Sequence, residues 1–124
     1  MRALIIEAHL LLAMMLEDEL RELGFNSFDI ATTQDAAVAA AMRQRPDLIT
    51  ASVHLAEGLG TEAVKIICNE QPIPTVYIVS NPAEVGDAST SSIVITKPIV
   101  KHALDEAVKR VTHRMADQRP LQAA

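Results

Sequence analysis

Five short apolar segments rich in branched residues recur along this chain, and a helical or loop segment separates each from the next. They cover residues 2–7, 28–31, 47–53, 75–80 and 92–96. Nearly continuous apolar runs of this length are typical of strands buried on both faces of a sheet. Strands that alternate with helices form parallel sheets through right-handed crossovers. The alternation therefore predicts a doubly wound α/β domain with a five-stranded parallel sheet.

The intervening segments predict four helices, over about residues 9–23, 33–44, 61–69 and 100–115. Helical spacing of leucines in the first helix ends at Gly24, a residue typical of a position just beyond a helix. Residues 81–91 contain Pro82 and Gly86, so we expect a loop or a single turn there, with the helix between strands four and five short or missing. In such sheets ligands bind at the carboxyl ends of the strands, near residues 7–9, 52–54, 79–81 and 97.

Length and composition narrow the class of protein. A chain of 124 residues suits one domain, which we place at residues 1–116, with a C-terminal tail at 117–124. The net charge of -5, without a cluster of Lys and Arg, argues against nucleic acid as a ligand. The longest apolar run, residues 10–16, is too short to span a bilayer, and we expect a cytoplasmic protein with no membrane contact. Cys68 is the single cysteine, and we expect an inert thiol.

Three stretches share a pattern with a known family. They are PDLITASVHLAEGLGTEAV from Pro46 to Val64, the Lys97–Pro98 pair after the fifth strand, and Glu7 with the helix that follows it. Through them the chain resembles a response-regulator receiver domain of two-component signalling, over about residues 2–112. LIIEAHLLLAMMLEDELRELG, VSNPAE and ITKP are similar to the receiver half of the general-stress-response regulators of Alphaproteobacteria, whose other half mimics a sigma factor. The resemblance implies a flavodoxin-like sheet of strand order 2-1-3-4-5.

The resemblance also locates a phosphorylation pocket and shows where this chain departs from it. The acidic pair that helps to hold Mg²⁺ falls on Glu7 and Ala8, and the phosphate-accepting aspartate falls on Ser52. Only Glu7 keeps a carboxylate at these three positions. We therefore expect no cofactor, and Mg²⁺ binding that is lost or very weak, because this hard cation needs carboxylate oxygens at a fixed site.

Of the remaining family positions, one keeps the family residue and the others depart from it or depend on the register. The Thr or Ser after strand four falls on Val79, or on Ser80 if the register shifts by one, and the aromatic switch residue falls on Val94. The lysine is kept as Lys97, and we hypothesise that its ammonium bonds to Glu7 or to the Ser52 hydroxyl and closes the pocket. A serine hydroxyl is a weak nucleophile without an activating base, so we expect no enzyme activity and no phosphoryl transfer.

The first helix carries more apolar residues than one core-facing side requires. The surplus residues are Leu10, Leu11, Met14 and Met15. Exposed apolar patches with adaptable methionines often mark interfaces. We interpret them as a candidate interface, either for a homodimer or for another partner.

The sequence thus favours a single-domain pseudo-receiver that acts by protein-protein interaction in phosphorelay signalling. Its partner would be a histidine kinase, a phosphotransfer protein or another regulator. Two alternatives stay open: a receiver phosphorylated on an unconventional residue, Ser52 or His54, and a pseudo-receiver that senses a small molecule. No glycine-rich phosphate loop follows the first strand, which argues against a nucleotide-dependent enzyme.

Overall fold

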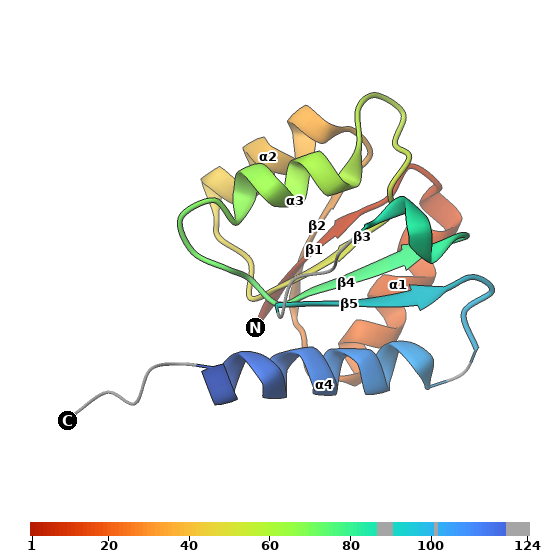
Figure 1. Ribbon diagram of the computed structural model, residues 1–124, viewed down its shortest axis with the longest axis vertical. Coiled ribbons are helices and arrows are strands. Elements are labelled where there is room, and N and C mark those ends of the chain that lie inside the picture. Colours follow the sequence, from red (N-terminus) through yellow and green to blue (C-terminus); the bar gives the residue numbers. More distant parts are fainter. Residues whose placement is uncertain (87–90, 101, 119–124) are drawn as a thin grey trace.

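A computed structural model describes residues 1–86, 91–100 and 102–118 of the chain. Within them five parallel strands form one sheet in the order β2-β1-β3-β4-β5 (Figure 1). The strands are β1 (Arg2–Ile6), β2 (Ser27–Ala31), β3 (Leu48–Ala51), β4 (Thr75–Val79) and β5 (Ser92–Thr96). The helices are α1 (Leu10–Glu22), α2 (Gln34–Arg43), α3 (Gly60–Ile67), the short 3₁₀ helix η1 (Pro82–Glu84) and α4 (Ala103–Gln118). This architecture confirms the predicted fold and strand order.

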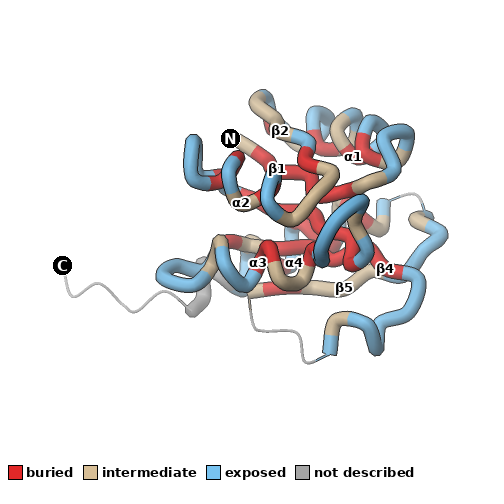
Figure 2. The backbone as a smooth tube through the Cα atoms, turned by 90° about the horizontal axis from the view of Figure 1, so that it is seen from above, coloured by how far each residue is buried: buried red, intermediate tan, exposed pale blue. Residues whose placement is uncertain are grey.

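The helices cover both faces of the sheet and create two apolar cores (Figure 1). Helices α2 and α3 pack on one face, over a cluster that includes Ile49 and Val79. Helices α1 and α4 pack on the other face, over a cluster that includes Leu48 and Ile78. Figure 2 shows the buried residues gathered along the strands, with exposed residues on the outer surfaces of the helices. Because both faces are covered, the central strands are apolar at nearly every position.

Local interactions set the helix boundaries. His9 caps α1, which we did not predict from the sequence, its ring Nδ1 accepting a hydrogen bond from the Leu12 N–H at 3.4 Å. The helix ends before Gly24, which takes a φ of +102° that side-chain-bearing residues rarely adopt. Thr33 caps α2, its hydroxyl oxygen accepting from the Ala36 N–H at 3.1 Å.

Some predicted boundaries differ from the observed ones. Strand β3 is shorter than predicted and runs from Leu48 to Ala51, and just before it the Asp47 carboxylate accepts a hydrogen bond from the Arg2 N–H at 2.8 Å. Helix α4 begins at Ala103 rather than at residue 100 and continues to Gln118, beyond the predicted end at residue 115. Between β4 and β5 the described residues form only η1, as the weak pattern predicted. Residues 119–124 of the predicted tail lie outside the described residues.

A close contact between backbones positions the turn that follows β3. The Gly60 N–H donates to the Val53 carbonyl at 2.8 Å, so the start of α3 lies against the end of β3. A Cβ on Gly60 would lie 1.7 Å from the Ser52 carbonyl oxygen, closer than any real contact. Residue 60 must therefore be glycine for α3 to start here. Among the described residues, no helix has the length and apolar character needed to cross a membrane.

Candidate functional site

The carboxyl ends of β1 and β3 bring Glu7 and Ser52 together, as the sequence predicted. These strands are neighbours in the sheet, and the Ser52 N–H donates to the Ile6 carbonyl at 2.9 Å. The Ser52 hydroxyl in turn donates a hydrogen bond to Oε1 of Glu7. The two residues are only 3% and 6% exposed, respectively. A buried carboxylate is thus held by a neutral hydroxyl at the position where the family pattern places an aspartate.

The second oxygen of Glu7 is also occupied within the protein. Its Oε2 accepts a hydrogen bond from the His9 N–H at 2.8 Å, at the start of α1. Both carboxylate oxygens therefore have protein donors, which is what a buried charged group requires. This arrangement links the first residue after β1 to the beginning of α1 and to the end of β3.

The donor set at this site does not fit a magnesium ion. Mg²⁺ takes oxygen ligands in octahedral geometry and is usually held through carboxylates. Here Glu7 supplies the carboxylate, Ala8 supplies no side-chain oxygen, and the Ser52 hydroxyl is neutral and directed at Glu7. Among the described residues, no group of three or more His, Cys, Asp and Glu side chains could hold a metal ion.

The hypothesis of a Lys97 bond to Glu7 or Ser52 is wrong. Among the described residues, Lys97 forms no hydrogen bond or ion pair with either side chain, and it is exposed. Lys97 follows the edge strand β5, which is two strands from β3 and three from β1. Neighbouring strands lie roughly 4.8 Å apart, so the lysine backbone begins about 10 Å from that of β3. Since Ser52 and the His9 N–H already satisfy Glu7, the ammonium stays in water.

Of the other family positions, Val79 and Ser80 lie at the same end of the sheet, and Val94 lies in the middle of β5. Val79 ends β4 and is buried, and its carbonyl accepts a hydrogen bond from the Lys97 N–H at 2.7 Å. Ser80 follows it and is exposed. Val94 pairs with Tyr77 across β4 and β5 and packs partly against the core under α2 and α3. An aliphatic side chain therefore occupies the position of the aromatic switch.

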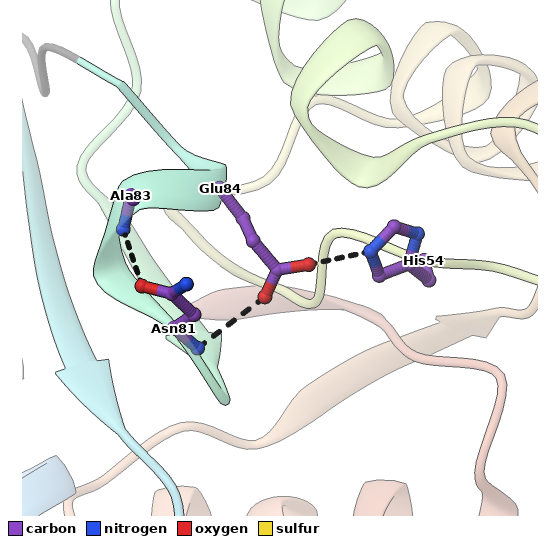
Figure 3. A network of polar contacts seen from close by, with 4 residues as sticks. All are labelled: His54, Asn81, Ala83 and Glu84. Carbon is purple, nitrogen blue, oxygen red and sulfur yellow. Dashed lines mark hydrogen bonds and ion pairs between the residues drawn. The ribbon is translucent and has the colours of Figure 1, made fainter.

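A polar network bridges the loop after β3 and the turn after β4 (Figure 3). His54 Nε2 contacts Glu84 Oε2 at 2.5 Å, and the other oxygen of Glu84 accepts from the Asn81 N–H at 3.3 Å. The Asn81 side chain accepts from the Ala83 N–H at 3.0 Å, which completes a capping box around η1. We did not predict Glu84 from the sequence, although the Asn81-Pro-Ala-Glu84 spacing is a signal for such a cap. His54, an alternative phosphate acceptor in the sequence interpretation, has its Nε2 engaged in this network.

The four surplus apolar residues of α1 are all exposed. Leu10, Leu11, Met14 and Met15 have exposed fractions of 59%, 64%, 59% and 56%. The opposite side of the helix buries Ala13, Leu16 and Leu20 against the sheet. The helix therefore packs on the sheet through one side only. The residues of the candidate interface lie on the surface.

A groove of about 570 Å³ lies between α3, β4, β5 and η1. Cys68 and Tyr77 both line it. Partial burial raises the pKa of the Cys68 thiol, which favours the unreactive protonated form. Burial, with a smaller contribution from Cys68, raises the pKa of Tyr77 to about 12. These shifts describe packing beside the groove and mark no activated nucleophile.

Comparison with known proteins identifies the class to which the fold and this site belong. No family model matches the chain. The solution structure of the receiver domain of the PhyR response regulator from Erythrobacter litoralis superposes with a TM-score of 0.81 and 28% identity, covering 90% of this chain and 89% of that one. The chain is a response-regulator receiver domain.

Curated relatives support this assignment and place the chain more narrowly. The phyllosphere-induced regulator PhyR of Methylorubrum extorquens is 35% identical over 99 residues, which are 77% of this chain and 37% of that protein. A protein-glutamate methylesterase/protein-glutamine glutaminase of Archaeoglobus fulgidus is 34% identical over 80 residues, or 64% of this chain and 23% of that protein. The receiver is PhyR-like, which confirms the resemblance predicted from the sequence. The chain spans well under half the length of these curated relatives.

Proposed function

We propose that this PhyR-like receiver accepts no phosphoryl group and acts by binding another signalling protein. The observation that carries the proposal is the hydrogen bond from the buried Ser52 hydroxyl to Glu7. Ser52 stands at the position where an active receiver has an ionised aspartate beside a metal ion, and its hydroxyl is bonded to Glu7. In this proposal the domain works through occupancy of a partner, and it carries no catalytic activity of its own.

The chemistry of phosphoryl transfer supports this proposal. Transfer depends on positioning and on cations that stabilise the equatorial oxygens of the phosphoryl group. The Lys97 ammonium is exposed and bonded to neither Glu7 nor Ser52 among the described residues, and the donor set does not fit Mg²⁺. The carboxylate of Glu7 would also repel an incoming phosphate. The unbonded lysine, the poor fit to Mg²⁺ and the repulsion by Glu7 each raise the barrier to phosphoryl transfer at Ser52.

The partner that we propose is a component of a phosphorelay: a histidine kinase, a phosphotransfer protein or a regulator with an intact receiver. The exposed apolar residues of α1 offer it a surface near Glu7, because α1 begins three residues after Glu7. Apolar patches of this kind are uncommon on monomeric proteins unless they bind something.

The proposal is tested by intact-mass measurement after incubation with acetyl phosphate, with and without Mg²⁺. We expect an unchanged mass in both conditions, in the wild type and in Ser52→Ala alike. A stoichiometric gain of one phosphoryl group would contradict the proposal. If the gain vanished in Ser52→Ala, the acceptor would be Ser52. If it persisted there but vanished in His54→Gln and was labile to acid, the acceptor would be His54.

A further inference from the structure

The groove between α3, β4, β5 and η1 has a polar floor. Thr75 and Tyr77 of β4 and Ser92 of β5 are buried and line it. The residues that alternate with them, such as Val76 and Ile93, point to the other face of the sheet and pack in the apolar core under α1 and α4. These two strands are therefore apolar toward α1 and α4, whereas their other face carries hydroxyl groups where the groove crosses it.

The groove lies where a crossover helix would cover β4 and β5. Helix α2 packs on β1 and β2, and α3 packs on β3, so both lie toward the other half of the sheet (Figure 1). A crossover between parallel strands is usually a helix, but among the described residues the connection from β4 to β5 forms only η1, of three residues. The hollow beside η1, of about 570 Å³, falls within the roughly 300–1,000 Å³ of small-molecule sites.

The Tyr77 hydroxyl in this floor has no partner in the described part of the chain. The residue is only 7% exposed, and its hydroxyl forms no hydrogen bond with any described residue. A buried tyrosine hydroxyl usually has such a bond. The neighbouring Thr75 differs, because its hydroxyl donates to the Ile73 carbonyl at 2.9 Å. Since Tyr77 lines the groove, its hydroxyl is available to a molecule that enters there.

The ionisation of Tyr77 determines which group the hydroxyl can bind. Burial, with a smaller contribution from Cys68 at the end of α3, raises the pKa of Tyr77 to about 12. The phenol is therefore protonated at neutral pH and can donate a hydrogen bond. The complementary group is an acceptor, such as a carbonyl oxygen.

The walls of the groove restrict the ligand further. Two carboxylates and one ammonium line it, from Glu62, Glu84 and Lys65. Lys65 lies 3.8 Å from Glu62, so it is already engaged, and the excess of carboxylates disfavours an anion. Val64 and Val85 provide apolar contacts on the α3 and η1 sides. These walls suit a molecule that is neutral and partly apolar.

We infer that this groove binds a small neutral molecule with an apolar body and a carbonyl oxygen, and that the Tyr77 hydroxyl donates a hydrogen bond to that oxygen. The inference goes beyond the proposed function, which does not depend on the groove. The polar floor argues against a partner helix, whose apolar face needs an apolar groove. Because Glu84 lines the groove and also contacts His54, a bound molecule would touch the network that joins the loops after β3 and β4.

The experiment is an NMR titration of the full, isotope-labelled chain with benzamide, a neutral ring that carries one carbonyl oxygen. We expect saturable shifts of backbone amides around the groove, with a dissociation constant on the order of 1 mM, as suits a probe of so few atoms. Benzoate has the same ring with a negative charge. It should bind roughly 5-fold more weakly or worse, because the carboxylates of Glu62 and Glu84 repel it.

Tyr77→Phe tests the hydrogen bond, since it removes the hydroxyl and keeps the ring. It should weaken benzamide binding roughly 5-fold, the effect of one neutral hydrogen bond. Thr112→Ala is the matched control, because it removes a hydroxyl that bonds within α4, on the opposite face of the sheet, and it should leave the affinity unchanged.

Four results would overturn the inference: no saturable shift with benzamide, shifts confined to residues outside the groove, equal affinity in Tyr77→Phe and the wild type, or benzoate binding as tightly as benzamide. The intact-mass measurement after acetyl phosphate tests the proposed function separately. A groove that binds nothing would therefore leave that function standing, and a phosphorylated chain would leave the groove inference standing.

Discussion

The hydroxyl of Ser52 and the carboxylate of Glu7 share a hydrogen bond inside the carboxyl end of the sheet, where both residues are buried. The bond joins β1 and β3 through side chains, beside the backbone bond from Ser52 to Ile6. It also leaves Glu7 fully satisfied, because the His9 N–H occupies the other oxygen. Two polar residues that would be costly to bury separately are thus stable together.

Replacing Ser52 by alanine should destabilise the domain although the side chain is small. The change removes the donor to Oε1 of Glu7 and leaves a buried carboxylate oxygen unsatisfied. We expect a loss of about 1–3 kcal/mol in the free energy of unfolding, measured by urea denaturation. Ser80→Ala, at an exposed position, should change it by less than about 0.5 kcal/mol. Equal effects of the two variants would show that the hydrogen bond contributes nothing.

Replacing Ser52 by aspartate should destabilise the domain and make its stability depend on magnesium. Two carboxylates about 4 Å apart repel by about 4 kcal/mol at an effective dielectric near 20. A bound Mg²⁺ would relieve this repulsion, so the melting temperature of Ser52→Asp should rise when the ion is added. Ser52→Asn has a similar shape without the charge, and its melting temperature should not respond. A matching magnesium response in the wild type would contradict our conclusion that its donor set does not fit the ion.

Much of the architecture could be predicted from the sequence because local chemistry determines it. The apolar runs of β4 and β5 gave strand positions that agree with the structure to within a residue. The cap at Thr33 depends on a side chain that reaches only three residues along the chain. The exposure of the surplus apolar residues of α1 followed from counting, since a helix on a sheet buries only one side.

The partners within the site could not be predicted in the same way, because they depend on competition between distant groups. Glu7 bonds to the Ser52 hydroxyl and to the His9 N–H, and it forms no bond to Lys97 among the described residues. The contact between His54 and Glu84 requires two loops that only the folded sheet brings together. Sequence patterns give the residue types at such positions, but the choice of partner depends on the geometry of several strands at once.

Replacing Gly60 by alanine should be among the more destabilising single changes in the chain. The new methyl group would lie 1.7 Å from the Ser52 carbonyl, and backbone on both sides would have to move. We expect a loss of about 3 kcal/mol or more, because overpacking here also displaces the start of α3. Gly24→Ala is the control, since a Cβ there meets nothing within 4 Å and adds only backbone strain of about 1–2 kcal/mol. Thermal unfolding measures both variants. A larger drop in melting temperature for Gly24→Ala than for Gly60→Ala would contradict the close contact at Gly60.

The ionisation of Tyr77 provides a direct measure of packing beside the groove. It is the single tyrosine in a chain without tryptophan, so absorbance near 295 nm reports it alone. Burial raises its pKa from 10.0 to about 12, and the midpoint in the folded protein should shift upward accordingly. Between these values the unfolded chain releases the proton and the folded chain keeps it, so the unfolded state binds fewer protons. Stability contributed by Tyr77 is therefore present below pH 10.0 and should be lost as the pH rises toward about 12. Tyr77→Phe should reduce this loss of stability, although the Cys68 thiol still titrates in that variant. An absorbance midpoint that is not shifted in the folded wild type would show that the phenol is solvated.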